Sequence, residues 1–276
     1  MTYKSMLAVV QSEREADHLI DSAVALAERF GAHLIGFHPE LVQVSYAMAA
    51  GFPDAEFLRD ATERSASTTR ALAGKFGHRL ESTKLSNAWA TMETLPGDTS
   101  AGALRLARST DLVVAAQPDP SSEAPETDAL LSDSGRPVLV IPRGHAPFDP
   151  MLRRIVIGWN GSKEAARAVF DALPLLKEAE FVEVLVVDPE ERRPGAVKQG
   201  EGIAATLARH GIHVQLVAAE KGRSSVEEAI VQHCSSAKAD LLVLGAYGHS
   251  WLREFLFGGV TRGVLDRAPI ATFMSH

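Results

Sequence analysis

A cluster of glycines near the end of the chain is the part of the sequence best suited to bind an anion. Gly245 and Gly248 follow a short apolar run, and Gly258 and Gly259 precede Thr261. We expect Gly245 to turn the chain with a positive φ, and backbone N–H groups to approach a ligand there. The residues after Gly259 read as a first helical turn, whose free N–H groups and dipole favour a phosphate without a lysine. The alternative is that these glycines only form tight turns.

Other patterns that could support catalysis or metal binding are incomplete. The stretch GHSWL at 248–252 resembles a nucleophile elbow, but Leu252 replaces the last glycine. The ten histidines are scattered and contain no H-E-x-x-H pattern, so we expect no metal held by side chains. Cys234 is the single cysteine, which leaves a small buried residue as the expected role and a redox role as the alternative. We find no general base, so we expect at most slow hydrolysis of a bound nucleotide.

The elements that would position the glycine cluster occur twice along the chain. A strand, helix and strand pattern at 4–40 recurs at 153–190 without a gap through most of its length. The stretch 142–150 between the two halves carries three prolines and a glycine, as a linker would. We therefore predict two domains that arose by duplication, at 1–147 and 148–276.

Short apolar strands alternate with helical patterns in each half, which predicts an α/β fold. Such alternation is typical of right-handed βαβ units, and strands that are apolar on successive residues fit a sheet covered on both faces. We predict two tandem doubly wound domains, each with a five-stranded parallel sheet. In such sheets ligands bind beyond the carboxyl ends of the strands, where the strand order switches. Gly245 directly follows a predicted strand at that edge.

The glycine spacing also supports a family resemblance. The pattern Gly245-x-x-Gly248, nine residues, Gly258 resembles the nucleotide loop of the universal stress protein family, and IVIGWNGSKEA at 155–165 resembles that family's first strand and turn. The resemblance covers essentially the whole chain, in tandem form. It implies an adenine nucleotide alpha hydrolase-like fold whose domains pair through their last strands. The residues implied in nucleotide contact are Asn160, Val187, Leu244, Gly245, Gly248, Gly258, Gly259, Val260 and Thr261.

Three positions in the second half depart from the family pattern. Asn160 replaces the usual aspartate and can hydrogen-bond a ribose without bringing charge. Gly259 replaces the usual serine or threonine, which removes a hydroxyl ligand of phosphate. Trp159 stands where the family has a smaller residue, and it either stacks on adenine or fills part of the pocket or core.

The first half has lost the glycine loop. Ala116 and Asp119 occupy the positions of the first two glycines, and Gln11 replaces the aspartate of the first strand. A carboxylate such as Asp119 or Glu123 would repel a triphosphate, so we expect no nucleotide in the first domain.

Composition limits the classes of partner. The net charge of -7 opposes general binding of nucleic acid, because that affinity rests on lysine and arginine. The sequence contains no run of 18 apolar residues, so it predicts no membrane-spanning helix. Its first residues do not have the pattern of a secretion signal. We therefore expect a cytoplasmic protein without membrane or nucleic-acid partners.

We predict a stress-response protein that binds ATP, with magnesium held through the phosphates, and that acts by binding or signalling. A homo-oligomer, a dimer, is expected beyond the pair of domains within the chain. One alternative is an interaction or scaffold protein of the same fold. Another is an enzyme of the wider adenine nucleotide alpha hydrolase-like group, although the S-G-G-x-D-S and H-x-G-H patterns are absent. The segment 41–65 reads as a cap, a partner surface or a helix extension, and the apolar stripe within 251–256 as core or subunit contact.

Overall fold

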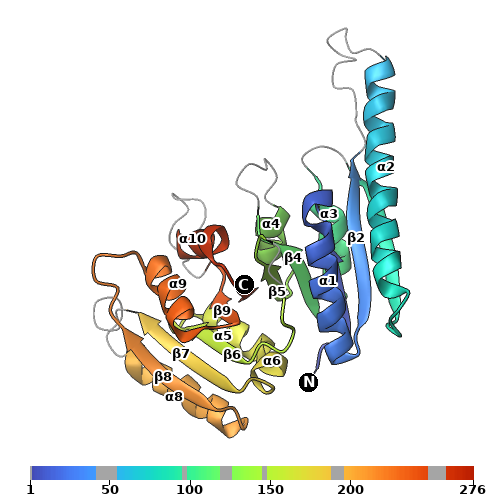
Figure 1. Ribbon diagram of the computed structural model, residues 1–276. Helices are drawn as coiled ribbons and strands as arrows, with labels where there is room; N and C mark the ends of the chain where they lie inside the picture. Colours follow the sequence, from blue (N-terminus) through green and yellow to red (C-terminus); the bar gives the residue numbers. More distant parts are fainter. Residues whose placement is uncertain are drawn as a thin grey trace. The chain divides into compact units, whose positions relative to one another are not determined.

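The computed structural model describes residues 2–41, 55–94, 98–118, 126–144, 148–187, 196–247 and 259–276. These residues divide into two compact units (Figure 1). The first unit contains residues 3–134 and Phe148, and the second contains 135–144 and 149–276. The predicted domain boundary near 148 remains a prediction, but residues 135–144 of the first repeat pack with the second unit.

The first unit is built on four parallel strands. Its elements are β1 (Ser5–Val9), α1 (Glu13–Phe30), β2 (His33–Leu41), α2 (Ala55–Leu80), β3 (Asn87–Thr94), α3 (Ser100–Ala107), β4 (Leu112–Ala116) and α4 (Glu126–Asp133). The strand order is β3-β2-β1-β4, and each of these pairs is parallel. All five residues of β4 are buried, and so are four of the five residues of β1, because helices cover the sheet. Residues 55–65, whose form the sequence left open, are the first part of α2.

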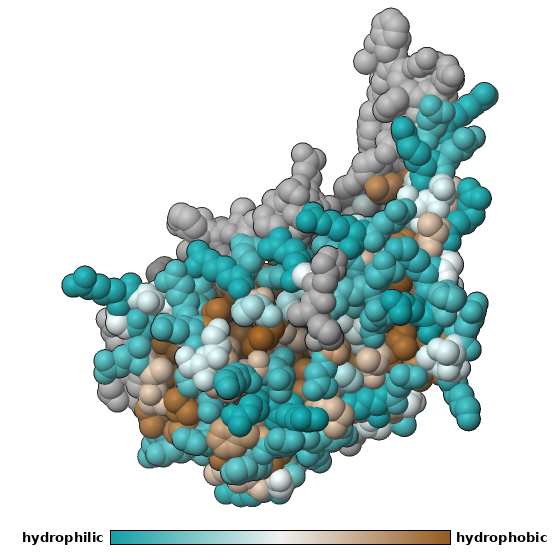
Figure 2. Space-filling view, in the orientation of Figure 1, coloured by the Kyte–Doolittle hydropathy of each residue, from teal (hydrophilic) through white to brown (hydrophobic). Residues whose placement is uncertain are grey.

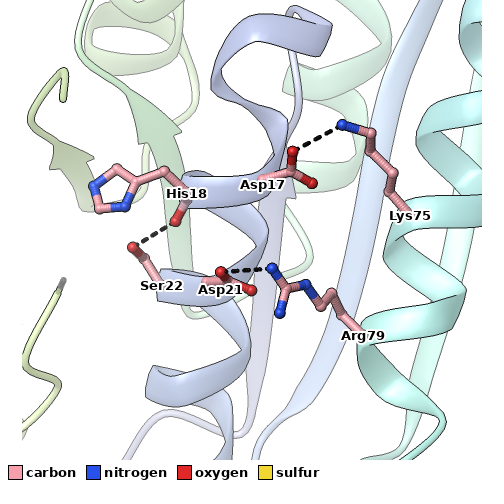
Figure 3. A network of polar contacts seen from close by, with 6 residues as sticks. All are labelled: Asp17, His18, Asp21, Ser22, Lys75 and Arg79. Carbon is pink, nitrogen blue, oxygen red and sulfur yellow. Dashed lines mark hydrogen bonds and ion pairs between the residues drawn. The ribbon is translucent and has the colours of Figure 1, made fainter. Parts of the chain in front are cut away.

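Two ion pairs join α1 to α2 on the surface of this unit (Figure 3). Lys75 Nζ lies 2.8 Å from Asp17 Oδ2, and Arg79 Nη2 lies 2.9 Å from Asp21 Oδ2. Both acids and both bases are spaced four residues apart, so each couple shares one helix face. The facing charges therefore fix which sides of the two helices meet.

The second unit is a five-stranded parallel sheet with one added antiparallel strand. Its elements are β5 (Val138–Ile141), β6 (Arg154–Gly158), α5 (Lys163–Asp171), α6 (Leu173–Leu176), β7 (Phe181–Val187), α8 (Ala196–Arg209), β8 (Val214–Ala219), α9 (Val226–Ala237), β9 (Leu241–Gly245), α10 (Gly259–Arg267) and β10 (Ala271–Ser275). The strand order is β5-β10-β9-β6-β7-β8. Figure 1 shows α9 and α10 packed side by side.

The two last strands of the repeats pair with each other. Phe273 of β10 pairs antiparallel with Leu139 of β5, and both side chains are buried. This agrees with the pairing through last strands that the family resemblance implied. The predicted α/β fold class with mostly parallel sheets is confirmed.

An aspartate closes the amino edge of each sheet. The Asp111 carboxylate accepts hydrogen bonds from the backbone N–H groups of Lys4 and Ser5. In the second unit the Asp240 carboxylate accepts from the Arg154 N–H at 2.8 Å. The N–H groups of Asp111 and Asp240 in turn donate to the carbonyls of Ser5 and Arg154. Ser5 and Arg154 are therefore equivalent positions of the two repeats.

The turn after the first strand of each repeat differs in length by one residue. Helices α1 and α5 begin after Ser12 and Ser162, which leaves one more residue between strand and helix in the second repeat. That residue is Gly161, whose φ of +69° suits glycine. On this alignment Gln11 corresponds to Asn160, as the sequence comparison proposed.

The face shown in Figure 2 is coloured mainly as hydrophilic, with hydrophobic residues in smaller areas. Among the described residues, Met151 and Phe170 are the large apolar side chains that are exposed. No described helix has the length and apolar character needed to span a bilayer.

Candidate functional site

The candidate site lies at the carboxyl edge of the second sheet, where β6 and β9 meet. The chain leaves β6 toward β7 on one side, while β9 and β10 lie on the other, so the strand order switches here. Gly158 pairs with Leu244 across this seam. Val187, Leu244 and Gly245 lie at strand ends. Gly259, Val260 and Thr261 begin α10, and Asn160 lies in the turn between β6 and α5. Gly248 and Gly258 lie outside the described residues.

Gly245 has a different structural role from the one expected. Its φ is not positive; the residue with a left-handed conformation is Tyr247, with a φ of 54°. A Cβ on Gly245 would overlap the backbone N of Ala165 and lie 2.9 Å from the Cβ of Glu164. Glycine is thus required because the first turn of α5 packs directly on the end of β9. The prediction of a positive φ at Gly245 was wrong because the chain turns two residues later.

Thr261 joins the two sides of the glycine segment. Its Oγ1 accepts a hydrogen bond from the Tyr247 N–H at 3.2 Å, and the residue is buried. Tyr247 also contacts His276 edge to face, and the His276 ring bonds the carbonyl of Ala246. The residues before and after the segment 248–258 are therefore held together, and α10 begins beside the end of β9.

Asn160 stabilises the turn that leads into α5. Its Oδ1 accepts from the Ser162 N–H at 3.0 Å, and Ser162 Oγ in turn accepts from the Ala165 N–H at 3.1 Å. Ser162 is therefore the N-cap of α5. Asn160 is exposed, and its amide oxygen is already engaged in this turn.

The side chains predicted to face adenine are only partly exposed to solvent. Leu244 is buried, and its side chain covers Gly158, where a Cβ would overlap the Leu244 methyl group. Val187 is half-buried at the end of β7. Trp159 is also half-buried, and its Nε1 is buried without a hydrogen-bond partner among the described residues. Of these side chains, Val187 and Trp159 remain accessible.

The sequence analysis missed Glu164, which is the main charged group at this edge. The residue is 4% exposed, and its Oε2 is buried without a hydrogen-bond partner among the described residues. Its Oε1 lies 3.4 Å from the Nζ of Lys163. A carboxylate near a helix N-terminus is stabilised by the helix dipole, which makes this burial tolerable. The sequence could have indicated this burial, because Glu164 shares the apolar face of α5 with Ala165 and Ala168.

Cys234 lies away from this edge, on the face of α9 that packs on the sheet. Burial, with the nearby charge of Glu183, raises the pKa of the Cys234 thiol to about 12. The adjacent His233 bonds Glu183 at 2.6 Å between Nε2 and Oε2. Since the thiolate is the reactive form, a buried apolar role fits Cys234 better than a redox role.

The described part of the chain contains no group of three or more His, Cys, Asp or Glu residues placed to hold a metal ion. The stretch 248–252 and the apolar stripe within 251–256 lie outside the described residues. The same is true of Asp119 and Glu123 in the first half.

Comparisons with known proteins agree with this fold. The model of the universal stress protein family matches residues 151–276. A universal stress protein from Archaeoglobus fulgidus DSM 4304 has a similar solved structure, with a TM-score of 0.70 and 14% identity, covering 98% of this chain and 95% of that one. A candidate universal stress protein from Pseudomonas aeruginosa UCBPP-PA14 gives a TM-score of 0.61 and 18% identity, covering 99% and 93%. No curated protein matches the chain.

The fold, two α/β repeats with mostly parallel strands, is the fold of these solved universal stress proteins. Residues 151–276, a little under half of the chain, therefore carry the match to the universal stress protein family. The resemblance drawn from the glycine spacing is thereby confirmed. The two solved structures extend the likeness of the fold to both repeats.

Proposed function

We propose that the second unit binds an adenine nucleotide, ATP, at the seam between β6 and β9. The observation that carries the proposal is the hydrogen bond from the Tyr247 N–H to Thr261 Oγ1. It brings the start of α10 back to the strand end from which the glycine segment departs. Backbone N–H groups of the first turn of α10 have no partners within the helix, so they are suited to donate to phosphate oxygens.

Each proposed contact has a physical basis in the described residues. Val187 would contact the adenine ring, and Trp159 offers an indole N–H that has no hydrogen-bond partner among the described residues. Leu244 would form the floor of the site through its packing on Gly158. Asn160 would meet the ribose through its exposed amide.

Magnesium would be held mainly through the phosphates. Mg²⁺ commonly takes one or two carboxylates together with substrate phosphates and water. Glu164 is a carboxylate beside the end of β9, and its Oε2, which has no hydrogen-bond partner among the described residues, fits such a role. The cation would also offset the repulsion between Glu164 and the phosphates.

The activity we propose is binding and signalling rather than turnover, within a stress-related role in the cytoplasm. A ligand changes a conformational equilibrium only if it binds one state better than another. Contacts of the phosphates with the segment between Tyr247 and Gly259 would provide that difference and alter a surface that meets a protein partner. A dimer of this chain is part of the proposal.

Calorimetric titration with ATP and magnesium tests the proposal. Thr261→Val keeps the shape of the side chain but removes the acceptor for the Tyr247 N–H, and we expect about tenfold weaker binding. Thr206→Val is the matched control, because Thr206 Oγ1 donates to a carbonyl within its own exposed helix. Absence of ATP binding by the unmodified protein would reject the proposal. If Thr261→Val and Thr206→Val bound ATP with equal affinity, Thr261 would have no role in the site.

A scaffold function without nucleotide is the second candidate, and the buried Glu164 carboxylate favours it. An unneutralised negative charge beside a phosphate site opposes binding. Native mass spectrometry of freshly purified protein separates the two functions. A bound nucleotide supports the first, and its absence together with no calorimetric binding supports the second.

A further inference from the structure

The second unit contains the dipeptide Asn160-Gly161, whose own atoms can react with each other. The side-chain amide carbon of an asparagine can be attacked by the backbone nitrogen of the next residue, which closes a five-membered ring. Glycine favours this attack because it has no Cβ to hinder the approach of its nitrogen. The chain contains two asparagines, Asn87 and Asn160, and of these Asn160 alone precedes a glycine.

The fold leaves the peptide bond after Asn160 outside the regular elements. Strand β6 ends at Gly158 and α5 begins at Lys163, so Gly161 lies in the turn between them. Its φ of +69° is a conformation that glycine adopts readily. Asn160 is exposed, so water reaches its side chain.

A hydrogen bond in this turn brings the Asn160 side chain toward the Gly161 nitrogen. The Ser162 N–H donates to Asn160 Oδ1 at 3.0 Å, which closes an Asx turn. Such a turn folds the side chain back over the peptide bond between Asn160 and Gly161. The hydrogen bond also draws electrons toward Oδ1, which makes the amide carbon more electrophilic. The turn that leads into α5 therefore also favours closure of the ring.

Asn87 provides the opposite case within the same molecule. It is also exposed, but it lies in β3 and pairs with Leu34 of β2. The Leu34 N–H donates to the Ser86 carbonyl, so a regular parallel ladder engages the Ala88 N–H with the carbonyl of Leu34. Ala88 also carries a Cβ. The nitrogen that would attack the Asn87 side chain is thus held in the sheet.

We propose that Asn160 is a site of spontaneous deamidation, which converts a neutral turn before α5 into a charged one. The Gly161 nitrogen gives its proton to hydroxide and attacks the amide carbon of Asn160. The new C–N bond forms as the bond to the side-chain nitrogen breaks, and that nitrogen takes a proton from water and leaves as ammonia. Water then opens the cyclic imide at either carbonyl, which gives aspartate or isoaspartate.

The conversion adds a carboxylate at the edge of the sheet where Glu164 is already buried. In the aspartate product an oxygen can still accept from the Ser162 N–H, and the dipole of α5 favours a negative charge before its first turn. The aspartate form therefore keeps the turn, whereas isoaspartate lengthens the main chain and disturbs it. The effect on ATP rests on the nucleotide site proposed above, where the added charge opposes phosphate without magnesium.

Incubation of the full chain at mildly alkaline pH, followed by peptide mass mapping, tests the proposal. We expect the peptide with Asn160 to gain the mass that exchange of NH2 for OH adds, with release of ammonia, while the peptide with Asn87 stays unchanged. The rate should rise with pH, because the Gly161 N–H must lose its proton. Gly161→Ala should slow the conversion, and Asn160→Gln should prevent it on the same timescale, because glutamine would have to close a larger ring. Asn87→Gln is the matched control and should convert at Asn160 as the unmodified protein does.

The same incubation in guanidinium chloride separates the role of the fold from that of the sequence. We expect the folded protein to convert Asn160 at least as fast as the unfolded chain. Slower conversion in the folded protein, equal conversion at Asn87, or an unchanged rate in Gly161→Ala would overturn the proposal. If Gly161→Ala does not fold, as judged by circular dichroism, the comparison of Asn160 with Asn87 in the unmodified protein decides.

The charged product is tested separately with Asn160→Asp. We expect this variant to fold and to bind ATP more weakly than the unmodified protein in the absence of magnesium. Failure of both proteins to bind ATP would reject the nucleotide site and leave the mass measurements on Asn160 interpretable.

Discussion

At the scale of single residues, the candidate nucleotide site is governed by a charge that no glycine pattern indicates. Glu164 is buried beside the end of β9, and one of its carboxylate oxygens has no hydrogen-bond partner in the described part of the chain. Such an oxygen either meets a cation or repels an anion. The two outcomes predict opposite effects of neutralising it.

We expect Glu164→Gln to tighten the binding of ATP in the absence of magnesium. Two like unit charges 4 Å apart repel by about 4 kcal/mol at an effective dielectric constant near 20, and the repulsion falls with distance, so removing the charge favours a nearby phosphate. Isothermal titration with and without magnesium measures the effect, and Glu201→Gln on exposed α8 is the control. Weaker binding of the variant only with magnesium would instead identify Glu164 as a ligand of the cation.

We expect the Cys234 thiol to resist alkylation in the folded protein at pH 8. Its pKa is raised to about 12, so the thiolate is scarce, and burial also restricts access. The raised pKa stabilises the fold below the ordinary thiol pKa of about 8.5, and this contribution is lost as pH rises toward 12. Mass-spectrometric labelling with iodoacetamide should be slow in buffer and fast in urea. Equal rates would contradict the assigned burial.

At the scale of elements, the close packing of α5 on β9 explains why glycine occurs at 245. The start of α5 occupies the space that a side chain would need. The order of strand, Asx turn and N-cap at Asn160 and Ser162 places the helix there. If α5 could not pack this closely against Gly245, the turn at Asn160 and the start of α5 would move away from the end of β9.

We predict that Gly245→Ala lowers the free energy of unfolding by about 1–3 kcal/mol, because the new methyl group must displace helix backbone. Gly202→Ala is the matched control, since nothing lies within 4 Å of the position in α8. That substitution should raise stability by roughly 0.5–1 kcal/mol through helix propensity. Urea unfolding of both variants gives the comparison, and a neutral Gly245→Ala would show that α5 can shift freely.

Sequence reasoning predicted the repeated strands, the parallel sheets and the turn at Asn160, because these depend on local pattern. It placed the positive φ at Gly245, whereas Tyr247 adopts it, because glycine content alone does not show what packs nearby. The burial of Glu164 was missed because it depends on the distant end of β9. The roles of Gly248 and Gly258 stay predictions.

At the scale of the whole molecule, the boundary between the two compact units does not coincide with the boundary between the two sequence repeats. Strand β5 belongs to the first repeat, yet it completes the sheet edge of the second unit by pairing with β10. Every residue of β10 is buried. An uncovered strand of that composition is a template for pairing with another chain.

We therefore predict that a fragment of residues 149–276 forms dimers through β10, whereas a fragment of 135–276 remains monomeric at the same concentration. The longer fragment retains β5, which occupies the pairing edge of β10. Sedimentation velocity distinguishes the two species. A monomeric short fragment, or equal association of both fragments, would show that β5 does not protect this edge.

The hydrogen bond from Tyr247 to Thr261 spans 14 positions of the chain. Because loop-closure entropy grows only with the logarithm of length, doubling the intervening chain costs about 0.6 kcal/mol. Insertions and deletions between these anchors can therefore accumulate during evolution with little effect on folding. The length of chain between these two anchors can thus vary while the sheet is preserved.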